Sequence, residues 1–165
     1  MSAARRLIPV AILFLLLVWQ GEFALRVLRS DMDFFQIQRD MVFWGSGEAR
    51  PSQEQVDAMA FRVDATVALW NTHPDYLAMQ ARIVAWQAVL ASGAERSAYI
   101  EEAARLMSLS LAIRPANPYS WAQYAEYLRA LPGQEAELDV AASKAMNLAP
   151  GDFALTERMR ALLIR

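Results

Sequence analysis

Few side chains in this sequence could act as nucleophiles, acid–base catalysts or metal ligands. The chain has no cysteine, which excludes a thiol nucleophile, a Cys-ligated metal and a disulfide. Its one histidine, His73, stands directly before Pro74, where a turn between helices is expected. No carboxylate lies at a His-x-x-Glu or Glu-x-x-His spacing from it. We therefore expect a helix-capping or solvated histidine and no metal site.

The carboxylates do not form a catalytic pair either. Asp31 and Asp33 are two residues apart, and Glu101 and Glu102 are neighbours, so on a helix neither pair shares a face. Paired-carboxylate chemistry needs two carboxyl groups that converge. The glycines fall at expected turns or within the N-terminal apolar segment, which leaves no glycine-rich phosphate loop. We expect no catalytic, cofactor-binding or metal-binding residues, and therefore not an enzyme.

The composition indicates that helices carry these residues. Alanine, the best helix former, is abundant, and the β-branched clusters typical of sheets are missing. Apolar residues recur at helical spacing between turns that contain proline or glycine. The formal net charge of -2 gives no electrostatic reason to expect nucleic acid as a partner. The sequence predicts an all-α protein with helices over about residues 52–71, 74–92, 94–114, 118–131, 134–148 and 153–163.

An apolar segment at the N-terminus has the length of a membrane-spanning helix. It runs from Leu7 to Leu25, about 28 Å as a helix against a hydrocarbon core of roughly 30 Å. Arg5 and Arg6 precede it, which favours a cytoplasmic N-terminus. A cleaved signal peptide is one alternative, but Glu22 occupies a position where its cleavage site needs a small residue. A buried core helix is another, and would not need the arginines. We expect an uncleaved signal anchor over residues 1–25.

Residues 26–51 are expected to continue this helix as a juxtamembrane segment that ends in a hinge. Their apolar residues form a stripe at helical spacing and a cluster. The stripe is Leu25, Leu28, Met32 and Phe35, and the cluster is Phe34, Ile37, Met41, Val42, Phe43 and Trp44. We expect the segment to pack on the helical domain, and a helix on the membrane surface or against a partner is the alternative. Gly45-Ser46-Gly47 and Pro51 break the chain before the helical domain at 52–165.

A repeat organises the helical domain. Pro115 and Pro150, which close two expected turns, are 35 residues apart (150 − 115). In the unit between them, large and small residues alternate at set positions of the first helix: Trp121, Ala125 and Leu128. The unit ends with Ala145, Leu148 and Pro150 at fixed spacing. This pattern resembles the tetratricopeptide repeat, although Leu138 stands where the repeat has alanine and one residue is inserted. The resemblance implies a short α-solenoid of antiparallel helical hairpins, clearest over residues 74–150.

A second resemblance rests on the junction between two repeat units. The chain there reads Arg114-Pro115-Ala116-Asn117-Pro118-Tyr119-Ser120-Trp121. With one N-terminal membrane segment and the helical hairpins around it, this phrase resembles the small polysaccharide-biosynthesis proteins of the VpsP type. The resemblance implies a place beside envelope or exopolysaccharide assembly machinery, and it brings no catalytic residues with it.

The repeat hypothesis also predicts a binding surface. If the first helix of each hairpin lines a concave face, the inward-facing positions include Tyr119, Ala122, Glu126 and Arg129, with Arg82 by looser analogy. This mixture of tyrosine, arginine and acid suits a peptide segment or a protein loop. We expect Trp121 to lie in the core. Aromatic side chains could also stack on sugar rings, which leaves direct glycan binding as an alternative.

These features together predict a membrane-anchored, non-enzymatic adaptor or scaffold of an envelope or exopolysaccharide biosynthesis complex. Its location would be a bacterial inner membrane, single-pass, with the helical domain in the periplasm. Its partners would be the membrane and protein subunits of the assembly machine, with no small-molecule cofactor. An adaptor of another envelope machine, for secretion or division, is the alternative.

Overall fold

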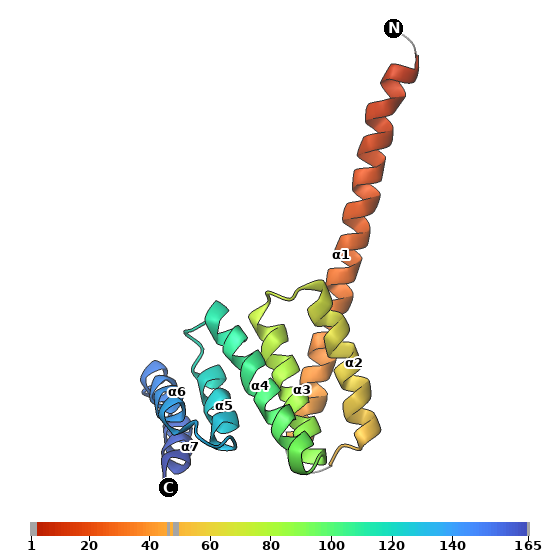
Figure 1. Ribbon diagram of the computed structural model, residues 1–165. Helices are drawn as coiled ribbons and strands as arrows, with labels where there is room; N and C mark the ends of the chain where they lie inside the picture. The colour runs from red at the N-terminus through yellow and green to blue at the C-terminus, as the bar shows by residue number, and fades with distance from the viewer. Residues whose placement is uncertain (1–2, 46, 48–49, 165) are drawn as a thin grey trace.

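The computed structural model describes residues 3–45, 47 and 50–164, with side chains from residue 9 onward apart from residue 10. Within these residues all regular structure is helical, which confirms the all-α prediction (Figure 1). Seven helices follow one another: α1 (Ala3–Gly45), α2 (Gln53–Leu69), α3 (Pro74–Leu90), α4 (Gly93–Ile113), α5 (Pro118–Arg129), α6 (Glu135–Leu148) and α7 (Phe153–Leu163).

Local capping interactions set where several helices begin. Ser52 accepts a hydrogen bond from the backbone N–H of Gln55, whose side-chain oxygen accepts one from the Ser52 N–H at 2.8 Å. Asn117 caps α5 by accepting hydrogen bonds from the backbone N–H groups of Tyr119 and Ser120, and Asp152 caps α7 by accepting one from that of Leu155. Pro118 occupies the first turn of its helix, where its missing N–H costs nothing. These helix starts are the ones that the sequence predicts.

The larger core contains side chains from all five helices from α3 to α7. Successive helices lie side by side and run in opposite directions from α1 to α5 (Figure 1). Small side chains fill the closest contacts, and five alanines of this core are fully buried: Ala81, Ala125, Ala141, Ala142 and Ala145. Leu138, which departs from the repeat pattern, is also buried in this core. Short helices can therefore approach closely, and the larger side chains fill the space beside the alanines.

A second core joins the end of α1 to α2 and α3. Ile37, Met41 and Trp44 of α1 are buried in it, against Val56 and Ile83 among others. This confirms the expectation that the juxtamembrane segment packs on the helical body. The remaining residues of the expected cluster differ: Phe34 is partly buried, whereas Val42 and Phe43 are exposed. The stripe of Leu25, Leu28, Met32 and Phe35 also lies on the exposed side of α1.

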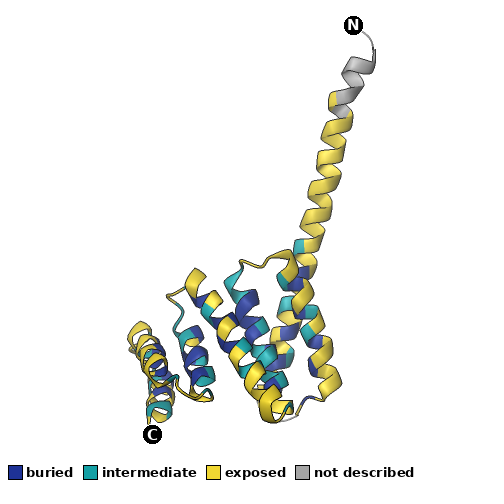
Figure 2. Cartoon of the chain, in the orientation of Figure 1, coloured by how far each residue is buried: buried dark blue, intermediate teal, exposed yellow. Residues whose placement is uncertain are grey.

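The first half of α1 extends away from the body as a single helix (Figure 1). Its side chains are exposed along the extended part, including the run of large apolar residues from Ile12 to Trp19 (Figure 2). By length and composition this helix is able to cross a membrane. The structure thus has two parts. The first half of α1 projects as an apolar helix, and the second half packs into the helical body.

Candidate functional site

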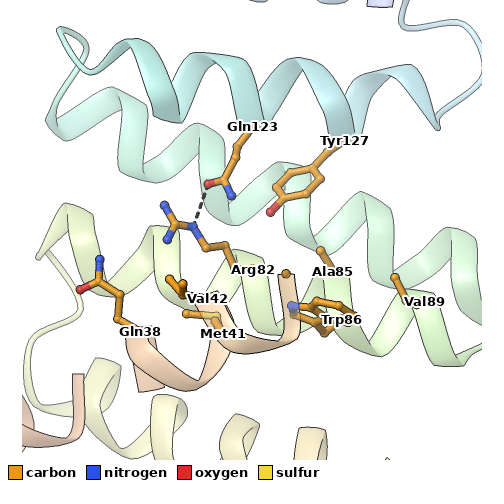
Figure 3. A pocket seen from close by; sticks show the side chains of 10 residues that line it. Gln38, Met41, Val42, Arg82, Ala85, Trp86, Val89, Gln123 and Tyr127 are labelled. Atoms are coloured by element: carbon orange, nitrogen blue, oxygen red, sulfur yellow. Dashed lines mark hydrogen bonds between the residues drawn. The ribbon is translucent and has the colours of Figure 1, made fainter. Parts of the chain in front are cut away.

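A groove lies between the second half of α1, α3 and α5 (Figure 3). It consists of two adjoining pockets that share Gln38, Met41 and Arg82, and we call it the α1–α3–α5 groove. The larger pocket has a volume of about 310 Å³. Along α3 the groove extends from Asp75 to Val89, about 21 Å of helix. That length accommodates about six residues of an extended peptide.

The walls of the larger pocket are mainly apolar. α1 contributes Met41 and Val42, and α3 contributes Trp86 and Val89. The indole ring of Trp86 packs edge-on against Trp44, with ring centroids 5.8 Å apart, so the second core fixes its position. Val42 and Val89 are 69% and 64% exposed. The pocket therefore presents apolar surface to solvent that a bound segment could bury.

Arg82 supplies the positive charge of this pocket. Its Nε donates a hydrogen bond of 2.9 Å to the side-chain oxygen of Gln123 on α5 (Figure 3). Among the described residues no carboxylate forms an ion pair with Arg82. A neutral amide leaves the guanidinium charge uncompensated, so the pocket favours a carboxylate or another anionic group beside its apolar walls.

Tyr127 adds a second polar group from α5. Its hydroxyl points toward Arg82 and Ala85 across the pocket (Figure 3). Burial raises the pKa of the Tyr127 phenol above its ordinary value, although the Arg82 guanidinium opposes this shift. The phenol is therefore neutral at physiological pH and can donate a hydrogen bond to a ligand.

The smaller pocket at the other end of the groove is held by an ion pair. Arg114 donates two hydrogen bonds to the carboxylate of Asp75, one of them with Nη1 to Oδ2 at 3.1 Å. Ser110 donates a hydrogen bond of 2.8 Å to the backbone carbonyl of Pro74. These contacts tie the start of α3 to the junction between α4 and α5. Arg114, the arginine of the Arg-Pro phrase, thus stabilises the fold, and Asp75 neutralises its charge.

The four residues predicted to contact a partner do not form one site. Arg82 lies in the groove. Tyr119 donates a hydrogen bond of 3.1 Å to Asp152, a contact that raises the pKa of its phenol, and Glu126 forms an ion pair with Arg158. Both residues therefore face α7. Arg129 is exposed at the end of α5 and does not line the groove.

Gln123 and Tyr127 of α5 line the larger pocket, and sequence reasoning missed both. Each is one position after a predicted inward-facing residue, Ala122 or Glu126, and Ala122 is instead buried in the core. One residue corresponds to about 100° around a helix. The four-residue spacing was correct, but the packing of α5 against its neighbouring helices α4, α6 and α7 determines which side chains face the groove.

From Phe23 onward, side chains at several positions along α1 contact the body. Phe23 and Trp70 pack edge-on with ring centroids 6.0 Å apart. Further along, the hydroxyl of Tyr76 donates to Asp31 at 2.5 Å, and Arg62 pairs with Asp33 at 2.7 Å. These carboxylates therefore contact different helices. The contacts fix the groove relative to the apolar half of α1.

No group of three or more His, Asp or Glu side chains that could hold a metal ion occurs among the described residues. His73 precedes α3, and its ring lies against Tyr76 with centroids 4.5 Å apart. Its side chain forms no capping hydrogen bond. What the described residues do offer is a groove with apolar walls in which Arg82 pairs with none of their carboxylates.

No protein-family model matches the chain, and no curated protein matches it.

Proposed function

We propose that this protein is a membrane-anchored, non-enzymatic adaptor that binds a segment of a partner protein in the α1–α3–α5 groove. The observation that carries the proposal is the exposed apolar groove with Arg82 uncompensated, on a body clamped to an apolar helix. The bound segment would place apolar side chains against Trp86 and Val89 and a carboxylate beside Arg82.

The helical body is proposed to be a short tetratricopeptide-like solenoid. Two features support this arrangement. α3 pairs with α4 and α5 with α6, while α5 also contacts α7, the first helix of the next pair. The groove lies along first helices of such pairs, which is where solenoids of this type present their concave surface.

The proposed location is a bacterial inner membrane, with α1 crossing it once over Leu7–Leu25. Arg5 and Arg6 favour a cytoplasmic N-terminus, which places the helical body in the periplasm. A role in envelope or exopolysaccharide assembly rests on the resemblance of the phrase from Arg114 to Trp121 alone. The partner would then be a protein subunit of that machine, such as a loop of a membrane enzyme.

Affinity purification from solubilised membranes tests this function. The full-length protein would be tagged as the wild type, as Arg82→Glu and as Arg129→Glu. Both substitutions reverse an arginine charge, but only Arg82 lines the groove. We expect the wild type and Arg129→Glu to recover the same polysaccharide-assembly protein, and Arg82→Glu to lose it.

Two outcomes would count against the proposal in different ways. Recovery of the partner by Arg82→Glu would remove the groove as the binding site. Recovery of a secretion or division protein, and of no polysaccharide-assembly protein, would replace the proposed machine with the alternative one. Binding of the full-length protein to glycans, abolished by a Trp86→Ala change, would assign the groove to sugar instead.

A further inference from the structure

Between residues 25 and 35, α1 exposes a continuous apolar stripe. Leu25, Leu28, Met32 and Phe35 are 56–68% exposed, and we call them the α1 seam. Their spacings of three, four and three residues are those of the a and d positions of a heptad repeat. All the large apolar side chains that are exposed between residues 25 and 35 belong to this seam.

The helical body of the same chain does not cover the seam. The side of α1 that is buried against the body is centred on Ser30, Phe34, Ile37, Met41 and Trp44. At about 100° per residue, the seam lies on nearly the opposite side of the helix from these residues. A partner could therefore approach the seam without meeting α2 or α3.

Lipid does not account for the exposed end of the seam. Met32 and Phe35 lie about 10 and 15 Å beyond Leu25, where the apolar segment ends. The helix between Leu25 and Phe35 also carries charged residues, including Asp31 and Asp33 in contact with the body. At that distance the seam faces water, where four large apolar side chains favour burial against another protein surface.

Gly21 extends the same register into the apolar half of α1. It stands four residues before Leu25, and Val18 and Phe14 continue the spacing of three and four. A Cβ added at Gly21 would meet no atom within 4 Å, so the single chain has no packing need for this glycine. Glycine costs helix stability relative to alanine, whereas at a helix–helix contact in a membrane it permits close approach.

We infer that the α1 seam binds the seam of a second copy of this chain in a parallel, symmetric helix dimer. Two copies inserted in the same orientation in one membrane place identical residues at the same height, which a two-fold contact requires. The next a position is Arg39, which is exposed and would end the close contact. The grooves stay open, because they begin on the flank of α1 at Gln38 and Met41.

Cysteine cross-linking in membranes tests the dimer directly, because the chain has no cysteine of its own. The full-length protein would carry Leu28→Cys, Met32→Cys or Arg26→Cys. Arg26 is an exposed residue at the same height, turned away from the seam, and serves as the matched control. We expect Leu28→Cys and Met32→Cys to form covalent dimers on mild oxidation, with roughly a tenth as much from Arg26→Cys, because a disulfide needs Cα atoms within about 7 Å.

The inference rests on the proposed membrane anchor for its parallel orientation, so each sample is first extracted with alkaline carbonate. Protein released into the supernatant would contradict the anchor, whatever the cross-linking shows. If the protein stays in the membrane pellet, equal cross-linking at all three positions or none at the seam would overturn the dimer. A Phe35→Arg change added to Met32→Cys should abolish the cross-link, while circular dichroism shows that the helical content is unchanged.

Discussion

Two arginines face the same groove and have different partners. Arg114 is neutralised by Asp75, whereas Arg82 is held by the amide oxygen of Gln123. A neutral acceptor orients a guanidinium without compensating its charge. Arg82 is therefore the residue through which the groove selects an anionic group, and Arg114 is a residue that stabilises the fold.

Trp121 stabilises the junction between α4 and α5 from a half-buried position. Its Nε1 donates a hydrogen bond of 2.7 Å to the backbone carbonyl of Pro115, and the ammonium of Lys144 lies 4.1 Å from the ring centroid. Trp121→Ala should lower the free energy of unfolding by about 2 kcal/mol, less than for a fully buried tryptophan. Trp121→Phe keeps the ring and should lose about 1 kcal/mol with the hydrogen bond. Denaturant unfolding of the detergent-solubilised protein measures both. No loss in Trp121→Phe would contradict a role for the hydrogen bond, and equal losses would contradict a role for the packing of the ring.

Tyr76 makes the stability of the α1–α3 contact dependent on pH. Burial, and then the hydrogen bond to Asp31, raise the pKa of its phenol from 10.0 to about 12. Since the folded-state pKa is the higher one, the neutral phenol stabilises the fold fully below pH 10, and this stabilisation is lost as pH rises toward 12. Tyr76→Phe should cost about 1 kcal/mol at neutral pH, because Asp31 is exposed.

The measurement for Tyr76 is the difference in unfolding free energy between the wild type and Tyr76→Phe from pH 8 to pH 12. The other tyrosines titrate in both proteins and cancel in this difference. A difference that shrinks above pH 10 agrees with the contact, and a constant difference would contradict it.

At the scale of single residues, the sequence predicts caps better than contacts. Ser52, Asn117 and Asp152 were predictable because a cap depends on a few neighbouring backbone groups. The groove position of Tyr127 was not, since it depends on how α5 is oriented by its packing against α4, α6 and α7. Arg82 was found by its spacing alone.

Among the elements, α1 has three different faces in its second half. One face forms the second core with α2 and α3, one flank lines the groove, and the opposite side carries the α1 seam. The segment was expected to pack on the helical body. The structure buries Ile37 and Met41 of the expected cluster, whereas the stripe over residues 25–35 stays exposed. An apolar stripe shows that a helix has a contact face, but it does not identify what covers that face.

Ile37 should be critical for the attachment of α1 to the body. It is fully buried in the second core, so Ile37→Ala removes apolar contacts and leaves a cavity there. We expect a loss of about 3 kcal/mol in the free energy of unfolding. Phe61→Ala, a larger truncation of a highly exposed side chain on α2, should change it by less than about 0.5 kcal/mol. Thermal unfolding followed by circular dichroism measures both, and similar effects would show that α1 does not share a core with α2.

For the whole molecule, the continuity of α1 has a mechanical consequence. The same helix contains the apolar segment and a wall of the groove, and clamps at Phe23, Asp31 and Asp33 join it to the body. With α1 in the proposed membrane-spanning position, a groove fixed in this way has a set height and angle relative to the membrane. A partner whose binding segment lies close to the membrane would reach the groove without any reorientation of the helical body.

The architecture of the whole chain was largely predictable, because alanine richness, prolines and caps act locally and agree with one another. The all-helical fold and the apolar N-terminal helix follow from those signals. The groove was not predictable as a unit, because it joins residues from Gln38 to Tyr127 whose proximity arises only from packing.

Site-specific photo-cross-linking in native membranes tests the central claim most directly. A photoreactive residue would replace Val89 in the groove or Val140 on α6, two exposed valines of which only the first lines the groove. We predict that Val89 yields a covalent adduct with one membrane-associated protein, that Arg82→Glu removes this adduct, and that Val140 yields none. No adduct from Val89, or the same adduct from both positions, would contradict the groove as a binding site.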